Sequence, residues 1–337
     1  MTSTLPLLDL SLLDGDDTAQ QRFRDELRRA THDVGFFYLV GHGVTDAQFA
    51  EMIDLSRQFF ALPEADKLAI ENTLSPHFRG YTRMGGELTL GKQDWREQID
   101  IGAERGAVAP GEGVDDYWVL DGPNLWPEGL PELKTASLAW IDRLNGIGAR
   151  LLSAWAEALG APADHFDAAF GEHPSPNMKI VRYPGKSGPV PEQGVGAHKD
   201  LGVLTLLYVE EGKGGLQVEK DGEWIDAPSV PGAFVVNIGE LLEVATDGYL
   251  KATLHRVISP SEGEERISVP YFHGPALDTE IPHIELPPEL AAEARGVTAD
   301  PNNPIHAVFG RNWLKSRMRA HPNVVEAHHP HLAGGAT

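Results

Sequence analysis

The chain has 337 residues, of which 41% are hydrophobic, and it contains no cysteine. This length and composition allow a large buried core, and the lack of cysteine excludes disulfide bonds and thiolate chemistry. The formal net charge of −22 argues against nucleic-acid and anionic-membrane partners, because both bind clustered lysine and arginine. The first ten residues lack the basic region of a signal peptide and include an acid at Asp9. No apolar run approaches the roughly 20 residues that span a bilayer. We therefore expect a cytoplasmic protein.

For the N-terminal region, residues 1–130, the sequence predicts helices and short strands, followed by loops that are expected to contact the substrate. Apolar residues recur at helical spacing, and Gly35 and a capping pattern that begins at Thr45 mark helix ends. The predicted strands are 7–10 and 36–40, and the predicted helices are 18–34, 45–60 and 62–70. His42 lies in a turn between two glycines and is expected to bond to the backbone. From residue 72 to residue 130 glycine and proline are frequent and periodicity fades, which is typical of binding loops.

Residues 131–275 predict a long scaffold helix and then a series of short strands. The helix spans 131–159, with Pro131 in its first turn and Gly160 after its end. The predicted strands include 179–183, 216–218, 224–225, 233–238, 253–258 and 267–272. Many short strands with turn signals indicate an α+β fold with a mainly β core, a double-stranded β-helix or jelly roll flanked by helices.

The C-terminal region, residues 276–337, predicts a proline-rich linker, a helix at 305–319 and a histidine-rich tail. The tail at 326–331 has no strand framework around it, so we expect it to fray. We expect the three regions to form one integrated catalytic unit.

Two histidines and one aspartate are spaced as metal ligands. His198 and Asp200 are two residues apart ahead of an apolar strand-like run, and residues i and i+2 of a strand point to the same face. His255 follows on a later predicted strand. Two imidazoles and one carboxylate on one side of a metal leave the other side open, as in non-haem Fe(II) oxygenases.

Arg266 and Ser268 repeat the two-residue spacing close to His255. A guanidinium and a hydroxyl on one face of a strand can hold a carboxylate by charge-assisted hydrogen bonds. The sequence therefore predicts a metal site with an anchor for an acid beside it.

The chain resembles the iron(II)/2-oxoglutarate-dependent dioxygenases, in particular the isopenicillin N synthase-like superfamily. The resemblance rests on H-x-D at 198–200, a distant histidine at 255 and R-x-S at 266–268, in that order and each in strand context. It is strongest over residues 177–275 and continues more weakly through the N-terminal half.

The resemblance implies roles for individual residues. Fe(II) would be bound by His198, Asp200 and His255, and the distal carboxylate of 2-oxoglutarate by Arg266 and Ser268 with help from Tyr183. O₂ would be the second co-substrate. The expected outcome is hydroxylation of a C–H bond of a small molecule with release of succinate and CO₂, although desaturation and cyclisation use the same site.

One departure from the family concerns position 181, where plant-type members often have asparagine and this chain has Val181. Lys179, on the same predicted strand face, is a candidate replacement for the missing contact to 2-oxoglutarate. Substrate contacts are expected in the 72–130 loops, with Arg79 and Tyr81 as candidates, and on the C-terminal helix. Asn237 is expected to be structural.

Two other functions fit the same motifs. One is an oxidase of the same fold that uses no 2-oxoglutarate, since such enzymes also keep R-x-S. The other is a non-catalytic, cupin-like protein that holds Zn or Ni. The sequence indicates neither the substrate nor the oligomeric state.

Overall fold

Two β-sheets and a small hairpin make up the β-structure of the computed structural model, which describes residues 5–109, 111–185, 193–297 and 303–335. The strands of the larger sheet are β1 (Leu7–Asp9), β2 (Phe36–Val40), β3 (Gly80–Thr82), β6 (Glu97–Gly102), β7 (Asn177–Pro184), β9 (Leu204–Val209), β12 (Phe234–Ile238) and β14 (Glu265–His273). The smaller sheet contains β8 (Gln193–His198), β10 (Leu216–Lys220), β11 (Glu223–Asp226) and β13 (His255–Ile258). The hairpin consists of β4 (Leu88–Thr89) and β5 (Lys92–Gln93).

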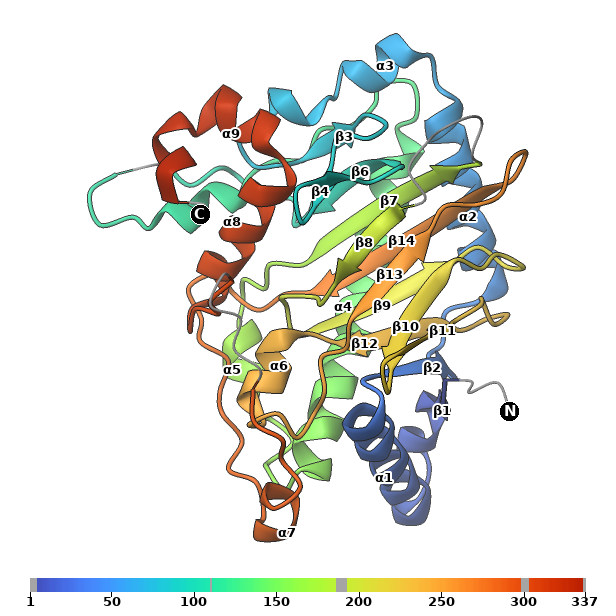
Figure 1. The fold of residues 1–337 in the computed structure, drawn as a ribbon, viewed down its shortest axis with the longest axis vertical. Helices are drawn as coiled ribbons and strands as arrows, with labels where there is room; N and C mark the ends of the chain where they lie inside the picture. Colours follow the sequence, from blue (N-terminus) through green and yellow to red (C-terminus); the bar gives the residue numbers. More distant parts are fainter. Residues whose placement is uncertain (1–4, 110, 186–192, 298–302, 336–337) are drawn as a thin grey trace.

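The two sheets pack face to face (Figure 1). The larger sheet has the order β1-β2-β12-β9-β14-β7-β6-β3 and the smaller one β11-β10-β13-β8. Apart from the parallel pair β1–β2, neighbouring strands are antiparallel. Between the sheets lies an apolar cluster that includes Val181, Val218, Val235 and Val257. The architecture is the predicted jelly roll.

Helices surround the sheets, most of them short. They are α1 (Asp17–Asp33), α2 (Asp46–Ala61), α3 (Glu64–Leu68), α4 (Glu132–Ala158), α5 (Asp167–Phe170), α6 (Glu240–Ala245), α7 (Pro288–Ala291), α8 (Phe309–Ala320) and α9 (Pro322–His328). Four 3-10 helices accompany them in the described residues, η1 (Leu10–Asp14), η2 (Asn72–Leu74), η3 (Asp116–Leu120) and η4 (Pro330–Gly335). In the part of the chain that the structure describes, no helix is long and apolar enough to cross a bilayer.

The long helix α4 is the predicted scaffold for the larger sheet. Its residues Leu144, Leu151 and Trp155 are fully buried in the main apolar core, which also contains side chains of α1, α2 and the outer face of the sheet. Because helices cover that face, the opposite face is left to contact the smaller sheet. The candidate site residues His198, Asp200, His255 and Arg266 line a cavity between the two sheets.

Several local predictions are confirmed. Thr45 and Gln48 form the capping box at the start of α2. His42 bonds to the backbone, since its Nε2 lies 3.0 Å from the carbonyl oxygen of Gly232 and its Nδ1 accepts from the Val44 amide. The β10–β11 hairpin turns at Asp221 and Gly222, both with positive φ, as a two-residue turn requires.

The prediction that the histidine-rich tail frays is wrong. Residues 322–328 form α9, and the following residues continue into η4. His328 and His329 each place Nε2 within 2.8 Å of a backbone carbonyl oxygen, of Thr73 and Pro76 respectively. Sequence periodicity does not reveal such contacts, because their partners lie some 250 residues away in the chain. In Figure 1 the red C-terminal helices lie beside the β4–β5 hairpin.

We expect Gly148→Ala to destabilise the fold. A Cβ at this buried position of α4 would lie 2.8 Å from ring atoms of His273 on β14. Overpacking of this kind costs about 1–3 kcal/mol, which outweighs the better helix propensity of alanine. The matched control is Gly146→Ala in the same helix, where a Cβ meets nothing within 4 Å, so stability should rise by about 0.5–1 kcal/mol. Urea denaturation measures both, and equal effects of the two substitutions would contradict the packing.

We expect the protein to lose stability as the pH falls below neutral. Burial lowers the pKa of His273 and of His321 from the ordinary 6.5 to about 3. Each histidine is therefore protonated in the unfolded chain before it is protonated in the folded one. The free energy of unfolding has its full value above pH 6.5. Between pH 6.5 and about pH 3, each of the two histidines lowers it by about 1.4 kcal/mol for every pH unit. In urea denaturation at several pH values, His321→Gln should show a smaller slope than the parent; an identical slope would contradict the assignment.

Candidate metal and co-substrate site

His198 and His255 face each other across two neighbouring strands. His198 ends β8 and His255 begins β13, and the antiparallel register pairs the two residues directly. Their ring centroids are 4.3 Å apart. In each ring Nδ1 lies near a backbone carbonyl oxygen, 2.8 Å from that of Gly196 for His198 and 3.1 Å from that of Thr253 for His255. A proton on Nδ1 satisfies these contacts and leaves the Nε2 lone pair of both rings available for a metal.

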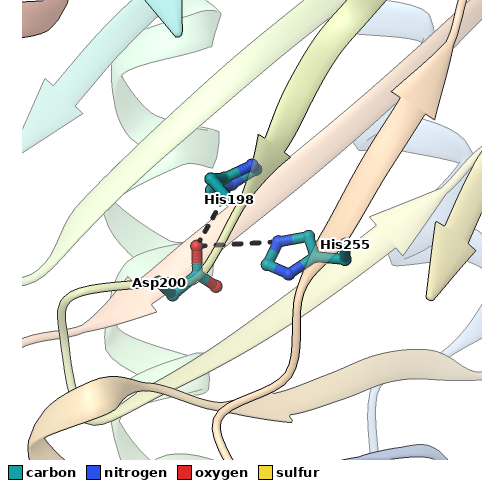
Figure 2. Close-up of side chains that lie close together, drawn as sticks. All are labelled: His198, Asp200 and His255. Atoms are coloured by element: carbon teal, nitrogen blue, oxygen red, sulfur yellow. Dashed lines mark ion pairs between the residues drawn. The ribbon is translucent and has the colours of Figure 1, made fainter. Parts of the chain in front are cut away.

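Asp200 completes the group, but not from the strand on which the sequence predicts it. β8 ends at His198, and Asp200 lies in the loop before β9. The alternation of a strand therefore does not place its carboxylate. Asp200 Oδ1 nevertheless lies 3.5 Å from His198 Nε2 and 3.7 Å from His255 Nε2 (Figure 2).

Two polar side chains hold the other oxygen of this carboxylate. Asp200 Oδ2 accepts a hydrogen bond of 2.6 Å from the Thr205 hydroxyl and one of 2.7 Å from the Asn237 amide. Both donors lie on the larger sheet, on β9 and β12, and both line the cavity between the sheets. Asn237, which was expected to have only a structural role, contacts a candidate metal ligand and orients Asp200. Oδ1 is thereby left to face the two imidazoles.

The geometry fits a divalent metal ion. Ligand atoms from His198, Asp200 and His255 all lie within 4.8 Å of one another, and no other such group occurs among the described residues. Burial lowers the pKa of His255 to about 4, so this imidazole is neutral at pH 7 and can act as a ligand. Burial alone would raise the pKa of Asp200, but His255 and His198 lower it below its ordinary value. The carboxylate is therefore charged, as metal binding requires.

Arg266 is a buried cation without a full set of partners. It is 2% exposed, and two of its nitrogens, Nε and Nη2, have no hydrogen-bond partner. Nη1 donates to the Ser268 hydroxyl over 3.4 Å, and the guanidinium lies 4.8 Å from the ring centroid of Tyr183. Burial lowers the pKa of Arg266 from its ordinary value. A buried guanidinium with free donors is satisfied by an anionic ligand such as a carboxylate.

The three candidate ligands and Arg266 line one cavity of about 470 Å³. Its walls come from all three regions of the sequence. They include Leu88 on β4 and Arg96 before β6, Tyr183 and Leu207 on the larger sheet, and Trp313 on α8. The expectation that the 72–130 loops and the C-terminal helix contribute to the substrate pocket agrees with this lining. A cavity of this size accommodates a small molecule.

One wall of the cavity contains buried charges that neutralise one another. Lys179 Nζ donates to Glu87 over 2.6 Å and lies 3.7 Å from Asp100. Arg96 lies 3.0 Å from Glu87, and Arg317 donates to Asp100 over 2.9 Å. Burial would raise the pKa of Glu87, but Arg96 and Lys179 hold it well below its ordinary value.

This network corrects the expectation for Lys179. Its side chain lines the cavity, as the strand pattern suggests, but two carboxylates already engage the ammonium group. The geometry therefore does not support Lys179 as a replacement for the co-substrate contact that is absent at Val181.

Contrary to the expectation from the sequence, Arg79 and Tyr81 do not line the substrate pocket. Arg79 is 4% exposed and donates to the Leu120 carbonyl oxygen and to Asn177. Tyr81 is likewise 4% exposed, and its hydroxyl donates to Glu97 over 2.6 Å. Neither side chain lines the cavity, because both pack the loops against the sheet.

Sequence reasoning missed Asp94, which ties the β4–β5 hairpin to β8. Its Oδ1 accepts from the Gly196 amide, and its Oδ2 accepts from the Thr89 hydroxyl and from Arg96. Gly196 lies two residues before His198, and a Cβ there would lie 2.9 Å from the Thr89 side chain.

The sequence predicts that the C-terminal helix contributes to the pocket, but it does not predict which residues of α8 line the cavity. The lining face of α8 presents Trp313, Ser316, Arg317 and Ala320, which are spaced three and four residues apart.

Comparison with known proteins agrees with this site. Residues 174–275 match the family model of the 2OG-Fe(II) oxygenase superfamily, and residues 5–129 match that of the non-haem dioxygenase in morphine synthesis N-terminal region. The chain is 35% identical to the 2-oxoglutarate-dependent dioxygenase frbJ of Dothideomycetidae sp. (strain 11243), over 96% of this chain and 91% of the relative. It belongs to the 2OG-Fe(II) oxygenase superfamily. It is thus an oxidoreductase that uses Fe(II), 2-oxoglutarate and O₂.

Other relatives have more specific names. Four plant proteins similar to this chain are called homoarginine-6-hydroxylases, and one of them, from Arabidopsis thaliana, is 34% identical over 96% of this chain and 91% of its own. Among solved structures, a full-length Neurospora crassa protein in complex with alpha-KG and thymine is similar, with a TM-score of 0.72 and 26% identity. That match covers 94% of this chain and 96% of the other.

We expect Asn237→Ala to weaken metal binding. The substitution removes one of the two donors that orient Asp200, and loss of such a contact typically lowers metal affinity by about 10- to 100-fold. Anaerobic calorimetric titration with Mn(II) measures the change. The matched control is Asn124→Ala, which removes a buried amide that bonds to Gly102 outside the cavity. Equal metal affinity of Asn237→Ala and the parent would show that this contact does not orient the ligand.

Proposed function

We propose that the chain is a hydroxylase that oxidises an aliphatic C–H bond of a small molecule. His198, Asp200 and His255 hold Fe(II), and Arg266 and Ser268, beside Tyr183, hold the distal carboxylate of 2-oxoglutarate. The observation that carries this proposal is that three convergent metal ligands and a buried, incompletely bonded guanidinium line the same cavity. The iron supplies oxidation by O₂ coupled to conversion of 2-oxoglutarate into succinate and CO₂.

In this proposal the residues of the chain bind the metal and the co-substrate, orient the metal ligands and exclude water from the site. The Nδ1 contacts of the two histidines fix their tautomers, and Thr205 and Asn237 fix the carboxylate of Asp200. The apolar side chains Val195 and Val257 line the same cavity as Arg266 and limit the access of water to its guanidinium. In a dry site the guanidinium attracts a carboxylate more strongly than it would in water.

We further propose that the substrate is a basic amino acid, with homoarginine as the first candidate. Support comes from the plant relatives named homoarginine-6-hydroxylases and from a cavity that presents both acidic and basic side chains. The three sequence regions act as one catalytic unit in this account, because each contributes side chains to the cavity wall.

The experiment is an O₂-dependent assay with Fe(II), 2-oxoglutarate and L-homoarginine. We expect homoarginine to raise succinate formation above the level seen without it, and mass spectrometry to find one oxygen atom added to it. Oxidation of homoarginine without succinate would favour the oxidase that uses no 2-oxoglutarate. Absence of succinate under all conditions would contradict the proposed function.

We expect Arg266→Gln to raise the KM for 2-oxoglutarate by about 10- to 100-fold, because hydrogen bonds to a charged group contribute about 1.5–3 kcal/mol. The matched control is Arg256→Gln on β13, where the guanidinium stacks on Trp224 and does not line the cavity. The control should leave this KM unchanged. An Arg266→Gln protein with the KM of the parent would remove Arg266 from the co-substrate site.

A further inference from the structure

Most charged side chains that line the cavity already have a partner of opposite charge within the protein. Lys179 pairs with Glu87 at 2.6 Å, Lys199 lies 3.2 Å from Glu243, and Arg317 pairs with Asp100. In the proposed function Asp200 is bound to the metal and Arg266 to 2-oxoglutarate. These charges are therefore not available to recognise a charged group of the substrate.

Glu240 is different. It lines the cavity and is partly buried, yet its carboxylate forms no hydrogen bond and no ion pair with any residue that the structure describes. It is the first residue of α6, and its backbone amide donates to the Asp200 carbonyl oxygen over 2.8 Å. The backbone of Glu240 is thus fixed directly to that of a candidate metal ligand.

The nearby cations do not form an ion pair with the Glu240 carboxylate. Lys199 and Lys315 attract it at longer range, but Lys199 is bound to Glu243, and Lys315 donates to the Pro304 carbonyl oxygen. An acid in the first turn of a helix is favourable in itself. The helix dipole would favour the acid equally if its side chain pointed to solvent. In a cavity, loss of solvent around an unpaired carboxylate costs free energy. A cation that arrives with the ligand would remove this cost.

We propose that Glu240 binds the cationic group of the substrate and thereby selects basic amino acids over neutral compounds of the same shape. The cation is a guanidinium or an ammonium group. This inference rests on the proposed function, since it assigns an occupant to the same cavity.

The test compares L-homoarginine with L-homocitrulline, in which a neutral ureido group replaces the guanidinium. We expect the parent to prefer homoarginine in kcat/KM, and Glu240→Gln to reduce this preference by about tenfold or more, because a charge-assisted hydrogen bond is lost. The ratio is the readout, because a general loss of folding or of metal lowers both values and leaves the ratio unchanged. Anaerobic calorimetry of both compounds with the Mn(II)–2-oxoglutarate protein measures the preference in binding alone, as a ratio of Kd values.

The matched control is Glu289→Gln, which removes an acid from the first turn of α7, away from the cavity. It should leave the preference unchanged. Glu240→Asp, which retains the charge on a shorter side chain, should retain part of the preference. A Glu240→Gln protein that still prefers homoarginine as the parent does would overturn the inference while the proposed function stands.

Two outcomes separate failure of the proposed function from failure of this inference. If the parent converts 2-oxoglutarate but neither homoarginine, arginine nor lysine raises the rate, the proposed substrate class fails and the inference falls with it. If the parent binds no Fe(II) or forms no succinate at all, the proposed function fails independently of Glu240.

Discussion

The register between β8 and β13 is the constraint on which the site depends. It sets His198 opposite His255, so that two imidazoles from distant parts of the sequence lie face to face. A shift by one residue would turn one of them to the other side of the sheet. Val195 on β8 lies opposite Val257 on β13, and both are buried between the sheets. A register shift between this pair and the histidine pair brings His198 opposite His255, so the metal site depends on this local irregularity as well as on the packing of the jelly roll.

The arrangement of buried charges divides the cavity into structural and binding parts. Where acids and bases neutralise each other, as around Glu87, the charges connect the loops, the sheet and α8. Where a charge lacks a partner, as at Arg266 and Glu240, a ligand can supply it. A buried ion pair contributes little net stability, whereas a buried unpaired charge is costly. Unpaired charges in the cavity are therefore the positions at which the fold gives up stability for binding.

The sequence predicts much of this because strand alternation and helix punctuation are local signals. The capping box at Thr45, the β10–β11 turn and the R-x-S pair at Arg266 all depend on residues close together in the chain. The errors concern residues whose partners are far away. Lys179 is a candidate by its place on the strand face of Val181, and Arg79 and Tyr81 by their place in the 72–130 loops. Glu87, Asn177 and Glu97 engage these three side chains instead. Asp200 reaches its predicted neighbours from a loop, which the H-x-D spacing alone does not distinguish from a strand.

The most direct test is anomalous diffraction from a crystal that contains Mn(II) and 2-oxoglutarate under anaerobic conditions. The account predicts one strong anomalous peak from an Mn(II) ion that is bound by His198 Nε2, His255 Nε2 and a carboxylate oxygen of Asp200. It also predicts the distal carboxylate of 2-oxoglutarate against the guanidinium of Arg266. A metal bound elsewhere, or a 2-oxoglutarate molecule whose carboxylates both avoid Arg266, would contradict it.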